Sequence, residues 1–389
     1  MGATQLVILG QGWLIFKLSG SALELGYLGA AASIPTILLA IVGGAMADRF
    51  DKRILLMLCS ASNVVLLSCL ALLDFSGLVQ VWHILCVALA ISFITGIEWP
   101  TRSAFFPHLI EREGMLSAVA LNAFIWQSTR MAMPAVGGFI ITLWGTWSIF
   151  ALAAVGYSFM FTVLLNMKIH VPGNKQESTW SQAKAGIQYI VNHELFAWLI
   201  LLTMVCMFFG NSYMQIMPVF IDLLGSDEQG YGTILSASGV GSLVGTFFII
   251  GLQHSPYLGR VILGGAAGLS ICLLGFWLSS LNGSFISAML FTMLAAAFGS
   301  GLMISTMTVL QMKVPDNLRG RVNGIHSMSY SMVPLGGLFL GMLSNSFSAP
   351  MAILLGASIS LAFCTYVALR KPVIRNFDGR EFQAVQPQE

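Results

Sequence analysis

The sequence predicts an all-α polytopic membrane protein made of two six-helix bundles, and three observations support this. Charged residues are 9% and apolar residues 57% of the 389 residues, whereas a soluble domain carries about 25% charged residues. The charges lie in short breaks between apolar runs, each about the 20 residues that a helix needs to cross a bilayer. The largest polar break, Lys168 to Glu194, leaves six runs on each side. We therefore expect twelve transmembrane helices.

Each apolar run is expected to be a helix, because backbone groups inside lipid must hydrogen-bond within their own segment. The first run has only about 16 residues, fewer than the ~20 of a full span, and we expect the recorded start to lie inside the first helix. The twelve expected helices are residues 3–18, 26–47, 54–73, 79–101, 117–143, 147–167, 195–221, 231–252, 260–281, 285–310, 321–345 and 350–369.

These helices predict four segments along the chain. They are an N-terminal six-helix bundle (1–167), a cytoplasmic central loop (168–194), a C-terminal six-helix bundle (195–370) and a cytoplasmic tail (371–389). Within the central loop, the apolar residues between Trp180 and Val191 recur at helical spacing. This spacing predicts an interfacial amphipathic helix, with a plain linker as the alternative.

The positions of the basic residues predict the topology. If the loop from Asp48 to Arg53 is cytoplasmic and the chain then alternates sides, every Lys and Arg except Lys17 and Arg130 falls on the cytoplasmic side. Such a bias is the positive-inside pattern, and the mirrored topology would invert it. We expect a multi-pass protein of the cell inner membrane, with the lipid bilayer around it and both termini in the cytoplasm.

The two halves of the chain resemble each other at an offset of about 200 residues. Segments that lie six spans apart have the same orientation, so an axis along the membrane normal relates the halves. Paired bundles around a midplane cavity are a transporter architecture. The matching residues are Gly20-Ser21 with Gly225-Ser226, Gly26-Tyr27 with Gly230-Tyr231, Pro107 with Pro315, Asn122 with Asn323, and Pro134 and Gly137-Gly138 with Pro334 and Gly336-Gly337.

A charged motif lies between the second and third expected helices, with the pattern G-x-x-x-D-R-x-x-[KR]-R. Its residues are Gly44, Asp48, Arg49, Lys52 and Arg53. The motif resembles the signature loop of the major facilitator superfamily, and the resemblance covers essentially the whole chain. It implies the major facilitator fold and a cytoplasmic gating role, in which the acid of the motif latches against the eleventh helix.

One residue of this loop indicates a particular branch of the superfamily. Asp51 stands where the superfamily usually has a glycine after Asp-Arg-x. This variation resembles the enterobactin-exporter-like, or transmembrane secretion effector, branch of the superfamily. The branch implies efflux of a small molecule as its activity.

The fifth expected helix carries Pro134, Gly137 and Gly138. It is similar to the G-x-x-x-G-P-x-x-G-G element of proton-coupled exporters, although Thr129 and Met133 replace two of the glycines. Proline removes a backbone donor and glycine permits close packing, so these residues predict a helix hinge. A kinked helix packed on the eighth or eleventh helix is the structural alternative, and both interpretations are compatible.

Arg130 lies near the middle of the same helix, and therefore near mid-bilayer. An arginine at that depth raises the free energy of insertion by at least ~2.5 kcal/mol, so it should face a cavity or a partner. We favour contact with an anionic or hydrogen-bonding substrate over a structural pair within the N-terminal bundle. Tyr330 has the same position relative to Pro334 that Arg130 has relative to Pro134, and we expect it to line the cavity from the other bundle.

Two titratable residues are candidates for proton coupling. Glu98 is the acid that lies clearly within an expected span, where it either exchanges a proton or pairs with Arg102 four residues on, and we favour the pair. His326 titrates near physiological pH, so it either relays protons or is a hydrogen-bonded bystander, which we favour.

Three amides complete the candidate cavity residues, namely Gln127, Asn211 and Gln215. Each either hydrogen-bonds a neighbouring helix or contacts substrate. Asn211 and Gln215 lie four residues apart, so an α-helix would place both on one face.

Motifs of soluble chemistry are absent from the sequence. It contains no phosphate-binding G-x-x-x-x-G-K-[ST], no H-E-x-x-H and no G-x-S-x-G. We therefore expect no enzyme activity, no cofactor, no metal site and no nucleic-acid partner.

The sequence predicts a monomeric secondary active transporter that works by alternating access. We expect proton-coupled export, as an antiporter, of an amphiphilic small molecule such as a siderophore, drug or metabolite. The alternatives are an importer or flippase of a nutrient or a lysophospholipid-like substrate, and a non-transporting membrane sensor with the same fold.

Overall fold

The computed structural model describes residues 1–111, 114–167, 179–252 and 255–380, and all regular structure in them is helical. The chain divides into two compact units. Unit 1 contains Met1–Trp180 and Ser226–Ser236, and unit 2 contains Ser181–Gly225 and Ala237–Glu389. The first turns of α10 (Glu228–Ile250) thus belong to unit 1 and its remainder to unit 2.

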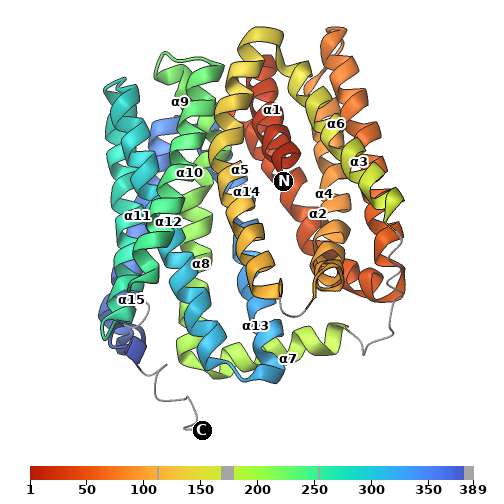
Figure 1. Ribbon diagram of the computed structural model, residues 1–389. Coiled ribbons are helices and arrows are strands. Elements are labelled where there is room, and N and C mark those ends of the chain that lie inside the picture. Colours follow the sequence, from red (N-terminus) through yellow and green to blue (C-terminus); the bar gives the residue numbers. More distant parts are fainter. Residues whose placement is uncertain (112–113, 168–178, 253–254, 381–389) are drawn as a thin grey trace. The chain divides into compact units, whose positions relative to one another are not determined.

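Unit 1 consists mainly of six long helices (Figure 1). The pairs α2–α4 and α3–α6 pack along much of their lengths, and α1 packs against α5 and α6. The helices are α1 (Gly2–Ser19), α2 (Ala22–Arg49), α3 (Lys52–Phe75), α4 (Val81–Phe105), η1 (Phe106–Leu109), α5 (Met115–Trp144) and α6 (Thr146–Asn166).

Unit 2 has more elements, because two of its membrane-spanning segments are interrupted. Its most extensive contacts join α11 to α12 and α11 to α15. The elements are α7 (Thr179–Asn192), α8 (Glu194–Val205), η3 (Cys206–Gly210), η4 (Asn211–Ile216), α9 (Met217–Leu223), α11 (Leu258–Leu281), α12 (Phe285–Lys313), α13 (Asp316–Ser327), η5 (Met328–Ser331), α14 (Met332–Ser346), α15 (Ala349–Arg370) and α16 (Pro372–Arg375).

Each of the twelve expected spans coincides with a helix or with a consecutive run of helical elements, so the all-α polytopic fold class is confirmed. Among the described residues, nine helical segments are long and apolar enough to cross a membrane by themselves. The expectation of twelve uninterrupted helices is wrong at two places. The seventh span is α8–η3–η4–α9, with a π-helical turn followed by a 3₁₀ turn, and the eleventh is α13–η5–α14.

Helix ends follow from local sequence. The Asp51 carboxylate accepts a hydrogen bond from the Ile54 amide at 3.1 Å and caps α3. Ser21 caps α2 and Ser348 caps α15 in the same way. Gly145 has φ 83°, which favours glycine, and it lets the chain turn at once from α5 into α6. The unusual acid in the charged loop is therefore a helix cap.

The amphipathic helix expected at residues 180–191 is present as α7. Gly186 of α7 lies against Arg321 and Ile325 of α13, where an added Cβ would stand 3.1 Å from each side chain. Ile190 joins a buried cluster in unit 2 with Phe196, Ile200, Leu310, Val314 and Val322. The end of the central loop thus packs into the second unit.

Part of the expected tail also packs onto unit 2. The Gly259 amide donates to the Phe377 carbonyl at 3.1 Å, and the Gly379 amide donates to the Ser255 carbonyl at 3.0 Å. Asp378 accepts from Arg380, which holds the pKa of that exposed carboxyl below its usual value. Residues up to Arg380 therefore dock beside the start of α11.

Candidate functional site

The site in unit 1 is built on α5, which is a continuous helix. Trp126 and Arg130 lie four residues apart, and Gln127 lies three residues before Arg130, so all three share one face. The Trp126 ring meets the Trp99 ring of α4 edge-on, with centroids 5.9 Å apart. Trp99 is 56% exposed, and Trp126 and Arg130 are partly buried. The site thus draws two contacting aromatic rings from α4 and α5 and a guanidinium from α5.

Four residues beyond Arg130, α5 crosses the start of α10 at backbone contact. An added Cβ on Gly232 would stand 2.3 Å from the Pro134 carbonyl oxygen, and one on Gly138 would stand 2.6 Å from the Glu228 carbonyl oxygen. The Ala135 amide next to Pro134 donates to Ser236 Oγ at 2.9 Å. Small residues at this crossing therefore permit the close approach.

The same turns of α10 also meet α1. The Tyr231 ring stacks on the Trp13 ring, with centroids 5.7 Å apart. On the other side of α5, an added Cβ on Gly137 would stand 2.5 Å from a Leu9 methyl of α1. The expected packing of the fifth helix on the eighth is therefore present, and the hinge role of Pro134, Gly137 and Gly138 stays a prediction.

Glu98 and Arg102 form the expected ion pair one turn apart on α4. The Glu98 side chain is 12% exposed and that of Arg102 is 34% exposed. Both charges act electrostatically on the Tyr157 hydroxyl of α6, which lies 3.4 Å from Thr4 Oγ1 of α1. The hydroxyls of Tyr157 and Thr4 therefore lie close to each other, with Tyr157 within electrostatic reach of the ion pair.

The candidate residues of unit 2 lie at its two helix interruptions. Asn211 and Gln215 belong to η4, and Tyr330, which is 62% exposed, belongs to η5. Because a 3₁₀ helix has about 3.0 residues per turn, residues four apart point about 120° away from each other. The expectation that Asn211 and Gln215 share one face is therefore wrong.

Two glycines of α14 explain how these interruptions pack. An added Cβ on Gly336 would stand 1.9 Å from the Phe208 carbonyl oxygen, and one on Gly337 would stand 2.5 Å from the Gln215 side chain. Asn211 Nδ2 approaches Met207 Sδ at 3.5 Å. The broken seventh span is thus held directly against α14, with Gln215 at the contact.

His326 lies in the last turn of α13 and is 3% exposed. Its Nε2 has no hydrogen-bond partner among the described residues. Both interpretations of His326, a proton relay and a hydrogen-bonded bystander, therefore stay predictions.

The residues of the charged motif lie at the end of α2 and the start of α3, and Arg53 among them bonds to another helix. Gly44 and Asp48 fall within α2, but their side-chain surroundings lie outside the described residues, while Arg49 is exposed and Lys52 is buried. Arg53 donates from Nε to the Leu164 carbonyl at 2.7 Å and from Nη2 to the Leu165 carbonyl at 2.8 Å. Arg53 therefore caps the end of α6, whose last carbonyls lack helical donors.

Sequence reasoning missed Trp126, Tyr157 and Ser236. Trp126 had a usable signal, because it stands one turn before the intramembrane Arg130. Tyr157 and Ser236 had none, because their partners lie on other helices. The described residues contain no cluster of three or more His, Cys, Asp or Glu suited to a metal ion.

Comparisons with known proteins place this arrangement in a family. Residues 4–387 match the model of the transmembrane secretion effector family. The chain is 25% identical to the staphyloferrin A transporter of Staphylococcus aureus over 87% of this chain and 85% of that protein. It is 23% identical to the enterobactin exporter EntS of Salmonella typhimurium over 73% of this chain and 68% of that protein.

Solved structures share the fold at low sequence identity. The nucleoside transporter NupG aligns with a TM-score of 0.69 at 12% identity, over 100% of this chain and 98% of that one. A bacterial homologue of the human lysosomal transporter Spinster aligns with a TM-score of 0.71 at 14% identity, over 99% and 97%. The chain is a multi-pass membrane protein that belongs to the transmembrane secretion effector family of major facilitator transporters.

Proposed function

We propose that this transporter exports an anionic, amphiphilic small molecule of the siderophore class across the inner membrane, in exchange for protons. The observation that carries the proposal is the α5 face on which Arg130 lies one turn from Trp126, itself in contact with Trp99. A guanidinium binds carboxylate and related oxygen anions through paired hydrogen bonds. Aromatic rings beside it add flat apolar surface. Such a face suits a ligand that is both anionic and partly apolar.

Two relatives support this substrate class by their names, since one transports staphyloferrin A and one exports enterobactin. Gln127 adds an amide donor and acceptor to the same face as Arg130. In unit 2, Tyr330, Asn211 and Gln215 supply neutral polar groups at helix interruptions, the kind of backbone that transporters use around binding sites. The proposal assigns these residues to substrate contact as well.

For coupling, we assign the exchangeable proton to Glu98. Protonation of its carboxyl would break the pair with Arg102 and change the electrostatic potential at Tyr157 of α6. His326 is the second candidate, because it is a buried titratable side chain in the last turn of α13.

For alternating access, we assign a gating role to the charged loop and a hinge role to α5. The loop residues are Gly44, Asp48, Arg49, Lys52 and Arg53, and the hinge residues are Pro134, Gly137 and Gly138. The monomeric state and the cytoplasmic position of both termini belong to the same proposal, as does the division into bundles 1–167 and 195–370.

The proposal is tested in everted membrane vesicles whose lumen is acidified. Wild-type protein should accumulate added enterobactin or staphyloferrin A in the lumen, and a protonophore should abolish the accumulation. Arg130→Ala should lower the initial rate about ten- to a hundred-fold, because a hydrogen bond to a charged group is worth about 1.5–3 kcal/mol. Arg260→Ala is the matched control, since Arg260 lies over the Tyr257 ring, 5.1 Å from its centroid, at the start of α11.

A second variant separates coupling from binding. Glu98→Gln should abolish accumulation driven by the pH gradient while preserving exchange of labelled for unlabelled substrate at equal pH. Full gradient-driven accumulation in Glu98→Gln would remove Glu98 from the coupling step. An unchanged rate in Arg130→Ala, with both siderophores transported, would remove Arg130 from the binding site.

A further inference from the structure

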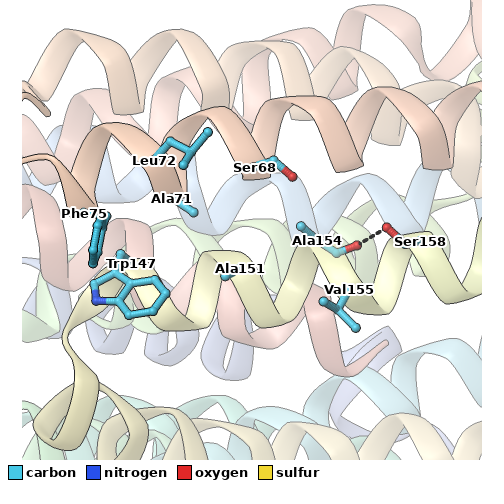
Figure 2. A pocket seen from close by; sticks show the side chains of 9 residues that line it. All are labelled: Ser68, Ala71, Leu72, Phe75, Trp147, Ala151, Ala154, Val155 and Ser158. Atoms are coloured by element: carbon cyan, nitrogen blue, oxygen red, sulfur yellow. Dashed lines mark hydrogen bonds between the residues drawn. The ribbon is translucent and has the colours of Figure 1, made fainter.

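A groove lies between α3 and α6 on unit 1, and none of its lining residues is assigned to transport (Figure 2). Its volume is about 530 Å³, within the range of ligand pockets. Four lining residues come from α3, namely Ser68, Ala71, Leu72 and Phe75, and five come from α6, namely Trp147, Ala151, Ala154, Val155 and Ser158. Alanines on both helices leave the space open, and the lining is almost entirely apolar.

The surroundings of the groove determine what can fill it. Both walls belong to helices that are long and apolar enough to span a membrane. Leu72, Phe75 and Val155 are each more than half exposed, so the groove opens outward from the unit. In a membrane-spanning segment of a multi-pass protein, that surface meets lipid. Lipid acyl chains, rather than water, therefore contact the groove.

The length of the groove fits one leaflet. Trp147 and Ser158 mark its ends on α6, and eleven residues of helix span about 16 Å at ~1.5 Å per residue. Half of a ~30 Å hydrocarbon core is about 15 Å. Trp147 and Phe75 close one end with rings 5.1 Å apart, at the point where α3 ends and α6 begins. Tryptophan is enriched at this level of membrane proteins.

A carboxyl group lies beside that aromatic end, within electrostatic reach of an amine. Asp74 precedes Phe75, accepts a hydrogen bond from Thr146 Oγ1, and interacts electrostatically with Lys17 at the end of α1. An acid and a base within electrostatic reach of each other match a zwitterion better than they match a simple anion or cation. A phosphate next to Lys17 and an ammonium next to Asp74 would satisfy both charges.

We propose that the α3–α6 groove binds one phospholipid of the leaflet at that end, with an acyl chain along the alanine floor and an ethanolamine head group between Lys17 and Asp74. An ammonium with N–H groups can donate to the Asp74 carboxylate, whereas the trimethylammonium of choline cannot. Phosphatidylethanolamine is therefore the preferred occupant over phosphatidylcholine. Phosphatidylglycerol lacks the cation altogether. This lipid site is separate from the substrate site and does not depend on the proposed export.

The test counts lipids retained by the purified protein in native mass spectrometry. The protein is first reconstituted in equal parts of phosphatidylethanolamine, phosphatidylcholine and phosphatidylglycerol. Wild type should retain one lipid, with phosphatidylethanolamine favoured about two- to five-fold, as expected for a partly exposed charge pair of up to ~1 kcal/mol. Ala151→Phe fills the groove and should lose this lipid. Phe159→Trp, on an exposed position of α6 outside the groove, should keep it.

A second pair of variants covers the case in which Ala151→Phe fails to fold. Lys17→Gln and Asp74→Asn leave the groove open and should retain a lipid without the preference for phosphatidylethanolamine. Equal lipid retention by wild type and folded Ala151→Phe would overturn the proposal. So would a wild type without head-group preference, or a wild-type dimer that Ala151→Phe converts to monomer, because a second copy would then occupy the groove.

Discussion

The two halves of the chain use the same glycine pair in different ways. In unit 1, Gly137 of α5 lies against the end of a leucine side chain on a regular α1. In unit 2, the equivalent Gly336 of α14 lies against a backbone carbonyl of the broken seventh span. The glycine pair therefore recurs in sequence position, but its first glycine meets backbone only in the second half, whereas in the first half it is the second glycine, Gly138, that meets the backbone of α10. A helix that approaches this closely can hold a neighbour whose hydrogen-bond ladder is interrupted.

The contrast extends to the polar residues. Unit 1 places a charged residue, Arg130, on an uninterrupted helix, while unit 2 places the neutral Tyr330 on a 3₁₀ turn at the matching position. A charged side chain can bind a ligand strongly without help from the backbone. A neutral hydroxyl binds more weakly, but a helix interruption beside it exposes backbone polar groups that can also bind the ligand. The halves thus offer different chemistry at matching positions of the repeated sequence pattern.

The largest expected effect is the difference in stability lost on substitution of Gly336 and of Gly137. Gly336→Ala should destabilise the protein by about 3 kcal/mol, because its Cβ would overlap the fixed Phe208 carbonyl. Gly137→Ala should cost about 1 kcal/mol, because the Leu9 methyl can move. Unfolding of the detergent-solubilised protein measures both. Gly320→Ala, at a position with nothing within 4 Å, is the control and should not lower the melting temperature. Equal losses at the two glycines would contradict the comparison.

The last helix of each half gives the next largest effect. Arg53→Ala should lower the free energy of unfolding by about 2 kcal/mol, since two charge-assisted bonds to the α6 carbonyls are lost. Lys371, after the end of α15, forms an ion pair with the exposed Glu194 at 2.8 Å and lies over the Trp198 ring. Lys371→Ala should cost about 1 kcal/mol or less.

Salt distinguishes these two contacts. The Lys371 contribution should shrink when 1 M salt is added, because the Debye length falls to about 3 Å. The Arg53 contribution should persist, because its partners are backbone carbonyls in a partly buried site. A salt-sensitive Arg53 variant would show that its charge acts mainly on acids of the loop.

The smallest expected effect concerns substrate contact in the second half. Tyr330→Phe should reduce siderophore transport in everted vesicles by about two- to ten-fold, because one neutral hydrogen bond is worth about 0.5–1.5 kcal/mol. This loss should be smaller than that of Arg130→Ala. Tyr366→Phe, at an exposed position of α15, is the matched control. A loss in Tyr330→Phe as large as that in Arg130→Ala would contradict the division of roles between the halves.

The positions and order of the helical spans could be predicted from the sequence, because a long apolar run in lipid must satisfy its backbone hydrogen bonds within its own segment. The helix at residues 180–191 followed from its apolar spacing, and the Glu98–Arg102 pair from its four-residue separation. All of these are local patterns. The site was predictable only in part. Arg130 could be identified because it is a charged residue within a long apolar run, whereas the contact of Trp99 with Trp126 joins two different helices and leaves no local pattern.

The sequence by itself determined where the chain is helical, because every long apolar run in a bilayer must form its backbone hydrogen bonds internally. The charged motif between the second and third expected helices also indicated the fold. Tertiary structure alone decided where two of those runs break, that Arg53 caps α6, and that α5 meets the start of α10 at Gly232. These features arise when segments far apart in the chain come within contact distance. The space beside Gly232 and the last carbonyls of α6 gain their partners only when the chain has folded.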